Sequence, residues 1–412
     1  MSKVRSALVI GGGVAGPVAA MALRKAGIEA TVHEAYPSTT GGIGGTLAIA
    51  PNGMAALGVV GADDAVRAVA LPITSMAMAV GHKRIGMLPT LPGLAPLQLV
   101  HRNDLHRVLH DLAVASGIAV QYQRKLVSVE EKPDRVVATF ADGGQAEADV
   151  LIGADGVHST VRAMIDPAAP GPHYTGLLGF EAVVDCEVDT APGTMTFVFG
   201  RRGYYLYTPL PGGGVRWGIN LPQDRPMSLV EARAIPASRW LERLQTAYGD
   251  EDPGGKLVRA TLSETLNIVG SLHIMPSVPH WWRGRMVLTG DAAHAPSNSS
   301  GQGASLAIES AVQLARCLRD LPLLTPPTNP PSHSPDPASA FAAYESLRRQ
   351  RVEGIAKRAA RINHAKAPGP VARTLMPILM PLMMKTVMRP ERTMGEEQRY
   401  RIDWPSTVAV MV

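Results

Sequence analysis

A glycine pattern near the N-terminus has the spacing of a phosphate-binding turn. Gly11, Gly13 and Gly16 form a GxGxxG directly after the apolar run Ala7–Ile10, and helical spacing follows over Val14–Ala26. Gly11 allows the tight turn, Gly13 lets a pyrophosphate approach the backbone, and Gly16 permits close packing of helix on strand. The helix N-terminus supplies free N–H groups and a positive dipole end. The pattern predicts a dinucleotide site, with a purely structural turn as the alternative.

An acidic residue follows at the place where a ribose would lie. Glu34 ends the second expected strand, Ala30–His33. A carboxylate at that position accepts hydrogen bonds from ribose hydroxyls. Because the residue is an acid and not Arg or Lys, the site favours an unphosphorylated ribose, hence FAD or NAD rather than NADP.

Two later motifs favour FAD. One is the DxxxGADGxxSxxR pattern over Asp149–Arg162, and the other is GDAAHAP over Gly290–Pro296, followed by GQGA over Gly301–Ala304. Together with Arg102, these motifs resemble the single-component (class A) FAD-dependent aromatic-hydroxylase-type monooxygenases, the p-hydroxybenzoate hydroxylase family, over roughly residues 5–365. The resemblance implies FAD, with NADH or NADPH as a transient reductant that binds against the flavin. It also implies insertion of one oxygen atom from O2 through a flavin C4a-hydroperoxide.

The resemblance assigns roles to residues around the flavin. It implies that Asp291 accepts a hydrogen bond from the ribityl chain, although Asp291 could instead cap the next helix. Gly301, Gly303 and Ala304 are expected to start a helix whose N–H groups face the flavin pyrimidine edge and stabilise negative charge there; a packing pair of glycines is the alternative. Arg102 is expected to lie along the pyrophosphate and flavin, or else to pair with Asp104 on a helix surface.

Three more positions are expected near the cofactor. The stretch from Gly41 to Gly45, with Thr46, resembles the flexible loop beside the isoalloxazine ring, and an ordinary glycine turn would look similar. The resemblance links Asp155 to FAD and to the reductant, but Asp155 could equally cap its own turn and hold Arg162. His294 is better explained as packed behind a nucleotide-binding turn than as a catalytic base.

The resemblance leads to a hydrophobic, aromatic or polycyclic small molecule as the substrate. Strand alternation puts Tyr205 and Tyr207 on one face, and Trp217 lies on the next strand, so these residues are candidate pocket residues. Packing of the same face on a core is the alternative. No residue is assigned as the catalytic base. A flavin dehydrogenase or reductase on the same scaffold, or a flavin-binding carrier without turnover, remains open.

The elements that must position these residues predict an α/β protein with a Rossmann-like FAD-binding domain, an inserted antiparallel-sheet substrate lobe and C-terminal helices. β-rich runs with Gly/Pro turns fill the middle of the chain, and a buried strand of the first kind returns at Met286–Thr289. The expected boundaries are 1–175 and 281–320 for the FAD-binding domain, 176–280 for the substrate lobe, 321–340 for a Pro-rich linker and 341–412 for the helical segment.

Composition excludes several classes. The 412 residues carry a net charge of +5 without a dense basic run, which disfavours nucleic-acid binding. Two cysteines, Cys186 and Cys317, rule out a disulfide framework and any CxxC or zinc site, so no metal is expected and a reducing cytoplasm fits. No apolar run is long enough to span a membrane. A monomer or homodimer is expected. The Met-rich stretch of the C-terminal segment packs on the core, caps a hydrophobic substrate channel, or contacts a membrane or a partner; its methionines are Met376, Met380, Met383, Met384 and Met388.

Overall fold

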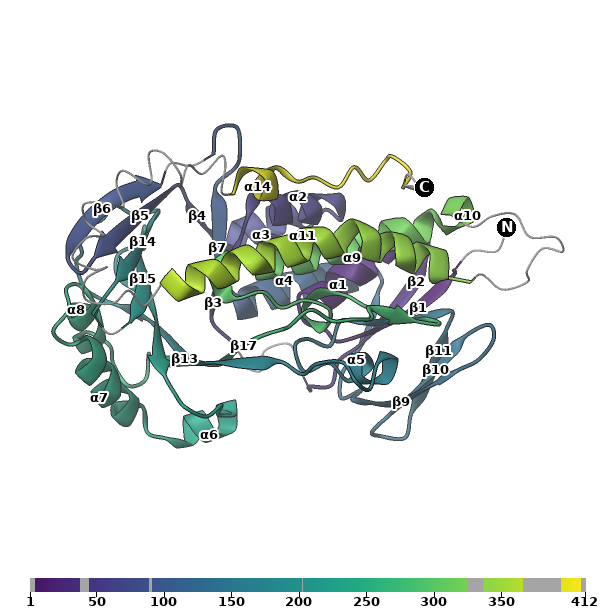
Figure 1. The fold of residues 1–412 in the computed structure, drawn as a ribbon, viewed down its shortest axis with the longest axis horizontal. Helices are drawn as coiled ribbons and strands as arrows, with labels where there is room; N and C mark the ends of the chain where they lie inside the picture. The colour runs from purple at the N-terminus through teal and green to yellow at the C-terminus, as the bar shows by residue number, and fades with distance from the viewer. Residues whose placement is uncertain are drawn as a thin grey trace.

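The computed structural model describes residues 4–37, 44–88, 91–201, 203–324, 336–365 and 394–408. Two parts lie end to end along the long axis, a nucleotide-binding part around β1 and α1 and a sheet lobe around β13–β16 (Figure 1). The expected Met-rich stretch and most of the Pro-rich linker lie outside the described residues. None of the described helices is long and apolar enough to cross a bilayer.

A six-stranded, mostly parallel sheet forms the centre of the nucleotide-binding part. Its order is β18-β19-β12-β1-β2-β8, and only β18 runs antiparallel to its neighbour. Apolar runs buried on both faces suit a parallel sheet covered by helices. The strands are β1 (Ser6–Ile10), β2 (Glu29–His33), β8 (Ala119–Gln121), β12 (Val150–Gly153), β18 (Trp282–Arg283) and β19 (Met286–Leu288).

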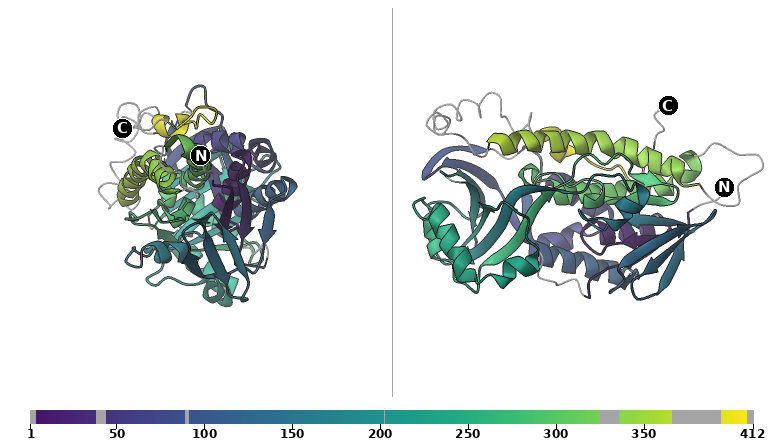
Figure 2. Two further views of the ribbon diagram at one scale, coloured as in Figure 1. Left: turned by 90° about the vertical axis from the view of Figure 1, so that its right-hand side faces the viewer. Right: turned by 60° about the horizontal axis from the view of Figure 1, so that its bottom comes forward.

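Helices cover this sheet and confirm the expected Rossmann-like layering. The buried central helix α9 lies against α1 and α2, and the long helix α11 runs beside α9 toward the sheet lobe (Figures 1 and 2). The helices here are α1 (Ala15–Lys25), α2 (Pro51–Val59), α3 (Asp63–Val69), α4 (Arg102–Ala115), α5 (Thr160–Ile165), η1 (Gly290–Ala292), η2 (Asn298–Ser300), α9 (Gly303–Arg319), α10 (Leu321–Leu324), α11 (Ala338–Ala365) and α14 (Gly395–Arg399).

Two small sheets lie beside the six-stranded sheet. One is an antiparallel β-meander of β9 (Leu126–Glu131), β10 (Val136–Phe140) and β11 (Gln145–Ala148). The other joins β3 (Thr46–Ile49), β7 (Leu97–His101) and β4 (Leu71–Ile73), with β7 in the middle. This second sheet connects the nucleotide-binding part to the sheet lobe.

The sheet lobe contains a seven-stranded sheet in the order β17-β13-β16-β15-β14-β5-β6. Its strands are β5 (Ser75–Val80), β6 (Lys83–Leu88), β13 (His173–Val184), β14 (Thr194–Phe199), β15 (Tyr204–Pro209), β16 (Val215–Pro222) and β17 (Asn267–Ile274). Two strands therefore come from 75–88, a stretch that the sequence analysis assigned to the FAD-binding domain. β5 pairs with β14 in parallel, a long-range pairing that local patterns do not encode.

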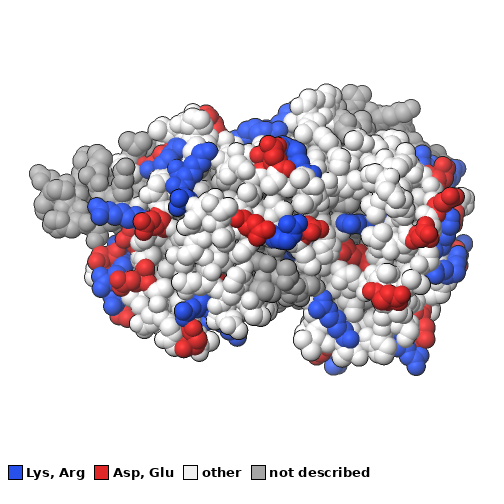
Figure 3. Space-filling view, turned by 180° about the vertical axis from the view of Figure 1, so that it is seen from behind, with Lys and Arg blue, Asp and Glu red and all other residues white. Residues whose placement is uncertain are grey.

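Three helices cover one face of the sheet lobe: α6 (Leu229–Ala234), α7 (Ala237–Tyr248) and α8 (Gly254–Arg259). Helices α6 and α7 are separated at Pro236, which cannot donate a backbone hydrogen bond. Below these helices lies a separate core with Trp217, Trp240 and Tyr248 fully buried. On the surface seen in Figure 3, basic and acidic side chains are interspersed, so no broad field of one charge covers that face.

Candidate functional site

The glycine turn after β1 has the geometry expected of a phosphate site. Gly11 has φ +107°, and a Cβ there would lie 2.4 Å from the carbonyl oxygen of Ala154. A Cβ on Gly16 would lie 1.9 Å from the carbonyl oxygen of Gly11, so α1 packs directly on the turn. A Cβ on Gly13 meets nothing within 4 Å, and no side chain caps α1. The turn is therefore fixed on both sides and open at Gly13.

Glu34 lies beside this turn, at the end of β2. Its Oε2 accepts a hydrogen bond from the backbone N–H of Gly12 at 2.6 Å, and its Oε1 accepts one from the N–H of Tyr36 at 2.9 Å. The side chain is half-buried. The carboxylate is thus held against the glycine turn, within reach of a ligand that lies across Gly12 and Gly13.

Asp291 and Arg102 form a second part of the site. Asp291 lies inside η1 and not at its N-cap, which is Thr289. Its side chain is accessible to solvent, yet burial by the surrounding protein raises the pKa of the carboxyl, against the opposing effect of Arg102. Asp104 pairs with Arg107 at 3.7 Å. Asp291 therefore lines an opening in the protein, next to a cationic group.

The start of α9 borders open space as well. Gly301 has φ +60°, and a Cβ on Gly301 or on Gly303 would meet nothing within 4 Å. The N-cap residue Gln302 makes no side-chain cap, and its side chain is buried. Ala304 follows in the first turn and is half-buried. Uncapped N–H groups at a helix N-terminus bind negatively charged groups, so this end can serve an anionic ring edge.

Asp155 caps its own turn. Its carboxylate accepts hydrogen bonds from Ser159 Oγ at 2.5 Å and from the N–H groups of Thr160 and Val161 at 2.7 and 3.1 Å. Burial raises its pKa against the effect of these bonds. Arg162 donates instead to the carbonyl oxygens of Ala292 and Val157. The capping alternative is therefore the one observed, and Arg162 ties the second motif to η1.

A carboxylate that the sequence analysis did not select anchors the loop at Gly45 and Thr46. Glu181, on β13, accepts hydrogen bonds from the N–H of Thr46 at 2.7 Å and from Asn267 Nδ2 at 3.0 Å. A Cβ on Gly45 would lie 2.9 Å from Glu181 Oε2, so only glycine fits there. Residues 41–43 of the same expected loop lie outside the described residues.

A cavity of about 370 Å³ opens beside this anchor. Its wall includes Gly44, His101, Glu181, Arg216 and Asn267. Arg216 donates to Thr46 Oγ1 at 3.0 Å, and His101 Nε2 lies 3.5 Å from Glu181 Oε1. The cavity therefore has charged and polar side chains in its wall, and it lies where the small β3-β7-β4 sheet meets the sheet lobe. Glu181 could have been noticed in the sequence, because it is a charged residue within the largely apolar strand β13.

The three candidate pocket residues lie on the face of the seven-stranded sheet that the helices of the sheet lobe cover. Tyr205 and Trp217 are fully buried and Tyr207 is 6% exposed, and all three belong to the core under α7 and α8. The Tyr205 hydroxyl accepts a hydrogen bond from Gly254 N at 3.1 Å, and Trp217 Nε1 donates to Thr261 at 3.1 Å. Core packing is the alternative that the structure supports. The three residues share one face as expected, but helices cover it.

The opposite face carries the side chains one residue away. Strand register places Tyr204 and Leu206 on the same face as Glu181. Tyr204 stacks on Phe197 at a ring-centroid distance of 6.1 Å, and both are half-buried. Leu206 and Phe197 pack with Met76, on β5, and with β3 and β7. This apolar face, formed by Tyr204, Leu206, Phe197 and Met76, adjoins the anchored loop.

A histidine of the GDAAHAP motif is buried behind the site. His294 is 5% exposed, and its Nε2 lies 2.8 Å from Ser310 Oγ. Burial lowers the pKa of His294 to about 3, so the ring stays neutral. The packing interpretation agrees with this environment. Within the described residues, no group of His, Cys, Asp or Glu side chains has the arrangement of a metal site.

Comparisons with known proteins agree with this geometry. A family model described as an FAD binding domain matches residues 5–215. The 3-amino-4-hydroxybenzoate 2-monooxygenase of Streptomyces cremeus is 32% identical over 369 residues, which cover 86% of this chain and 86% of that protein. The 6-hydroxynicotinate 3-monooxygenase of Pseudomonas fluorescens is 29% identical over 404 residues, with coverage of 88% and 91%.

A solved structure extends the similarity to the whole fold. The crystal structure of Klebsiella pneumoniae HpxO, complexed with FAD and uric acid, matches with a TM-score of 0.78 at 25% identity and covers 96% of each chain. The open positions at Gly13, Gly301 and Gly303, together with two uncapped helix N-termini, fit a cofactor that carries a pyrophosphate and an anionic ring edge.

Proposed function

Because the chain belongs to the FAD-dependent monooxygenases of the aromatic-hydroxylase type, we propose that it inserts one oxygen atom from O2 into a hydrophobic aromatic or polycyclic molecule. NADH or NADPH is the proposed reductant. The observation that carries the proposal is the open, uncapped glycine turn at Gly13, which faces solvent at the end of a parallel sheet. In such sheets, dinucleotides bind at the carboxyl ends of the strands.

We assign FAD to the residues that border the open positions. The Gly11–Gly16 turn and the N-terminus of α1 would hold the pyrophosphate, Glu34 the ribose, and Asp291 the ribityl chain. The uncapped start of α9 at Gly301–Ala304 would face the pyrimidine edge, with Arg102 beside it. Asp155 acts indirectly, because its carboxylate already bonds its own turn.

Bound FAD supplies the redox chemistry and the activation of O2, and the chain supplies position and exclusion of water. The start of α9 stabilises negative charge at the ring edge through its dipole. Glu181 holds Thr46 through a 2.7 Å hydrogen bond, which fixes the start of β3 to the sheet lobe. The apolar face of Tyr204, Leu206, Phe197 and Met76 excludes water from the reacting carbon.

The same apolar face supports the substrate class. A stacked Tyr204–Phe197 pair offers a flat surface that favours aromatic rings over flexible polar chains. The polar groups lie at one edge, around Arg216 and Glu181. We therefore propose a substrate with an apolar ring system and one polar substituent, oriented so that the substituent faces this polar edge.

The experiment is a screen of phenols and polycyclic aromatics with purified FAD-loaded protein under 18O2. We expect substrate-stimulated NAD(P)H consumption and one labelled oxygen atom in the product. Product without label would identify a dehydrogenase and refute the proposal. Tight FAD binding without any NAD(P)H consumption above background, with or without added compounds, would identify a flavin-binding carrier. The Gly13→Val variant is the control, because it should consume no NAD(P)H above background.

A further inference from the structure

A buried carboxylate lies in the middle of the apolar helix α9. Glu309 is 0% exposed, and Arg348, also 0% exposed, pairs with it at 2.7 Å. Arg351 forms a bidentate pair with both of its oxygens at 2.9 Å. Burial alone would raise the pKa of Glu309, but Arg348, Arg351 and Asn52 outweigh burial and lower it. Glu309, Arg348 and Arg351, called the triad below, are therefore all charged.

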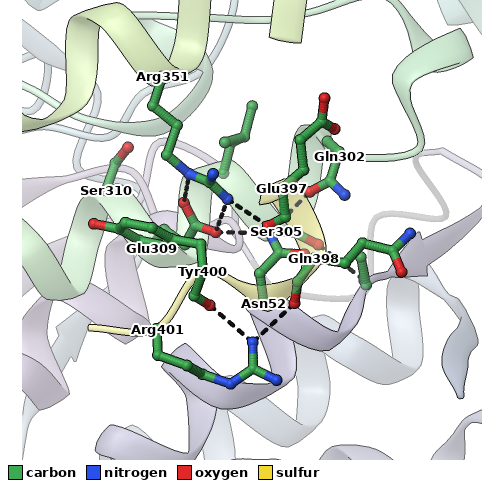
Figure 4. A network of polar contacts seen from close by, with 12 residues as sticks. Asn52, Gln302, Ser305, Glu309, Ser310, Arg351, Glu397, Gln398, Tyr400 and Arg401 are labelled. Carbon is green, nitrogen blue, oxygen red and sulfur yellow. Dashed lines mark hydrogen bonds and ion pairs between the residues drawn. The ribbon is translucent and has the colours of Figure 1, made fainter. Parts of the chain in front are cut away.

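The triad is hydrogen-bonded, through neighbouring side chains, to the two motifs that are assigned to the cofactor, GQGA and GDAAHAP. Asn52, at the start of α2, donates from one Nδ2 to Glu309 Oε1 at 2.6 Å and to Gln302 Oε1 at 2.9 Å (Figure 4). Gln302 is the N-cap residue of α9. On the other side, Arg348 Nε donates to Ser310 Oγ at 3.1 Å, and the same oxygen lies 2.8 Å from His294. One carboxylate thus connects the GQGA and GDAAHAP segments.

A C-terminal segment covers the triad from outside. Arg351 donates to the carbonyl oxygen of Glu397 at 2.7 Å, and its guanidinium lies 4.0 Å from the centroid of the Tyr400 ring. Arg348 lies 5.6 Å from the same ring. Figure 4 shows Tyr400 against Glu309 and Arg351. The cover keeps the triad in a low-dielectric environment, where its charge acts over a longer distance.

The charge of the triad does not cancel. Glu309 contributes one negative charge, and Arg348 and Arg351 contribute two positive charges. Glu309 lies seven residues after Gln302, which is about 10 Å along a helix axis. The remaining positive charge lies behind the N-terminus of α9 and has the same sign as the helix dipole at that end.

We propose that Glu309, Arg348 and Arg351 form a positioning unit that holds the two cofactor motifs in register and sets the electrostatic potential at the flavin through its net positive charge. The carboxylate of Glu309 is bonded to Asn52, which also bonds Gln302, so the unit would act on the cofactor through these two residues. The inference rests on the FAD site of the proposed function and is independent of the substrate.

Stability alone does not explain the arrangement. Replacing a buried ion pair by well-packed apolar residues is often neutral or stabilising, because the charges lose their hydration. A triad with excess charge is more costly to bury than a neutral pair. A role in charge placement accounts for the second arginine, which a structural pair would not need.

The test compares charge-changing variants by the Kd values for oxidised and for reduced FAD. The variants are Glu309→Gln, Arg351→Gln and Arg351→Lys, with Arg349→Gln as the control. Arg349 is also on α11, but it pairs with Glu345 and Glu353 outside the triad. Anaerobic titration gives the ratio of the two Kd values, and the shift in the flavin midpoint potential on binding is proportional to the logarithm of that ratio.

We expect shifts of opposite sign. Glu309→Gln makes the unit more positive and should favour reduced FAD by about tenfold, whereas Arg351→Gln should favour oxidised FAD by a similar factor. Arg351→Lys and Arg349→Gln should leave the ratio within about twofold. Shifts in the same direction, or no shift in Arg351→Gln, would overturn the proposal. If Glu309→Gln does not fold, the comparison of Arg351→Gln with Arg351→Lys decides.

These measurements need neither substrate nor oxygen. A protein that binds FAD and shows the expected shifts, but inserts no oxygen, would refute the proposed function and leave this inference intact. Normal hydroxylation without the shifts would refute this inference and leave the proposed function intact.

Discussion

Substitution of Gly13 separates cofactor binding from folding. A Cβ at this position meets nothing within 4 Å, so Gly13→Val should fold with the stability of the parent chain. The added side chain would occupy the space through which a pyrophosphate reaches the backbone. Loss of two charge-assisted hydrogen bonds, each about 1.5–3 kcal/mol, gives roughly 3–6 kcal/mol, or at least about a 100-fold weaker affinity for FAD.

Gly16→Ala is the matched comparison from the same motif. Its Cβ would lie 1.9 Å from the carbonyl oxygen of Gly11, and the neighbouring residues of α1 are buried and cannot move aside. Overpacking of this kind costs about 1–3 kcal/mol and often more. Gly16→Ala should therefore lower the unfolding temperature of the FAD-free protein, whereas Gly13→Val should not.

The assay is thermal unfolding of the FAD-free proteins, together with titration of FAD followed by flavin fluorescence. A Gly13→Val protein that binds FAD as tightly as the parent would show that the cofactor does not cross this turn. A Gly13→Val protein that unfolds as early as Gly16→Ala would show that the space at Gly13 is needed for folding. Either result would refute the reasoning.

Three further predictions concern the ribose, the sheet faces and pH. Glu34→Ala should weaken FAD binding by about 1–3 kcal/mol in a titration, and unchanged affinity would make Glu34 a surface acid. Tyr204→Ala should raise KM by up to about tenfold with FAD affinity unchanged. Tyr205→Phe should instead lower the free energy of urea unfolding by about 1–2 kcal/mol and leave KM unchanged. The reverse pattern would contradict the assignment of the two sheet faces. Burial lowers the pKa of His33 to about 4 and of His294 to about 3, against 6.5 for an exposed ring. The unfolded chain then binds more protons at mildly acidic pH, so urea unfolding should show stability that falls as pH drops from 6.5 toward 4. Constant stability over that interval would argue against neutral buried rings.

Local motifs predicted the nucleotide-binding part well. The GxGxxG turn, Glu34 and the start of α9 each depend on spacing within one strand–turn–helix unit, and the structure has those elements where the sequence indicated. The identity of the cofactor needed the resemblance as well, because glycine spacing alone does not distinguish FAD from NAD. Contact of these residues with FAD remains a prediction.

The sequence could not predict which face of the seven-stranded sheet is covered by helices. Tyr204 and Tyr205 are adjacent and chemically alike, and both faces of the seven-stranded sheet carry apolar side chains. Alternation shows which residues share a face but not which element covers it. Glu309 was missed for another reason: a charged residue within the apolar run Leu306–Leu314 was a usable signal, since such residues are rarely buried unless paired.

The origin of the seven-stranded sheet affects how the substrate lobe can be engineered. β14 has β5 as its outer neighbour, and β5 and β6 come from 75–88, about a hundred residues before the rest of that sheet begins. A chimera that exchanges only 176–280 with a homologue would ask a foreign β14 to pair with the resident β5. Mismatch there would expose a strand edge and promote aggregation. An exchange that carries 75–88 together with 173–274 keeps the sheet intact. Substrate specificity in this protein can therefore be transferred only by exchanging the two segments together.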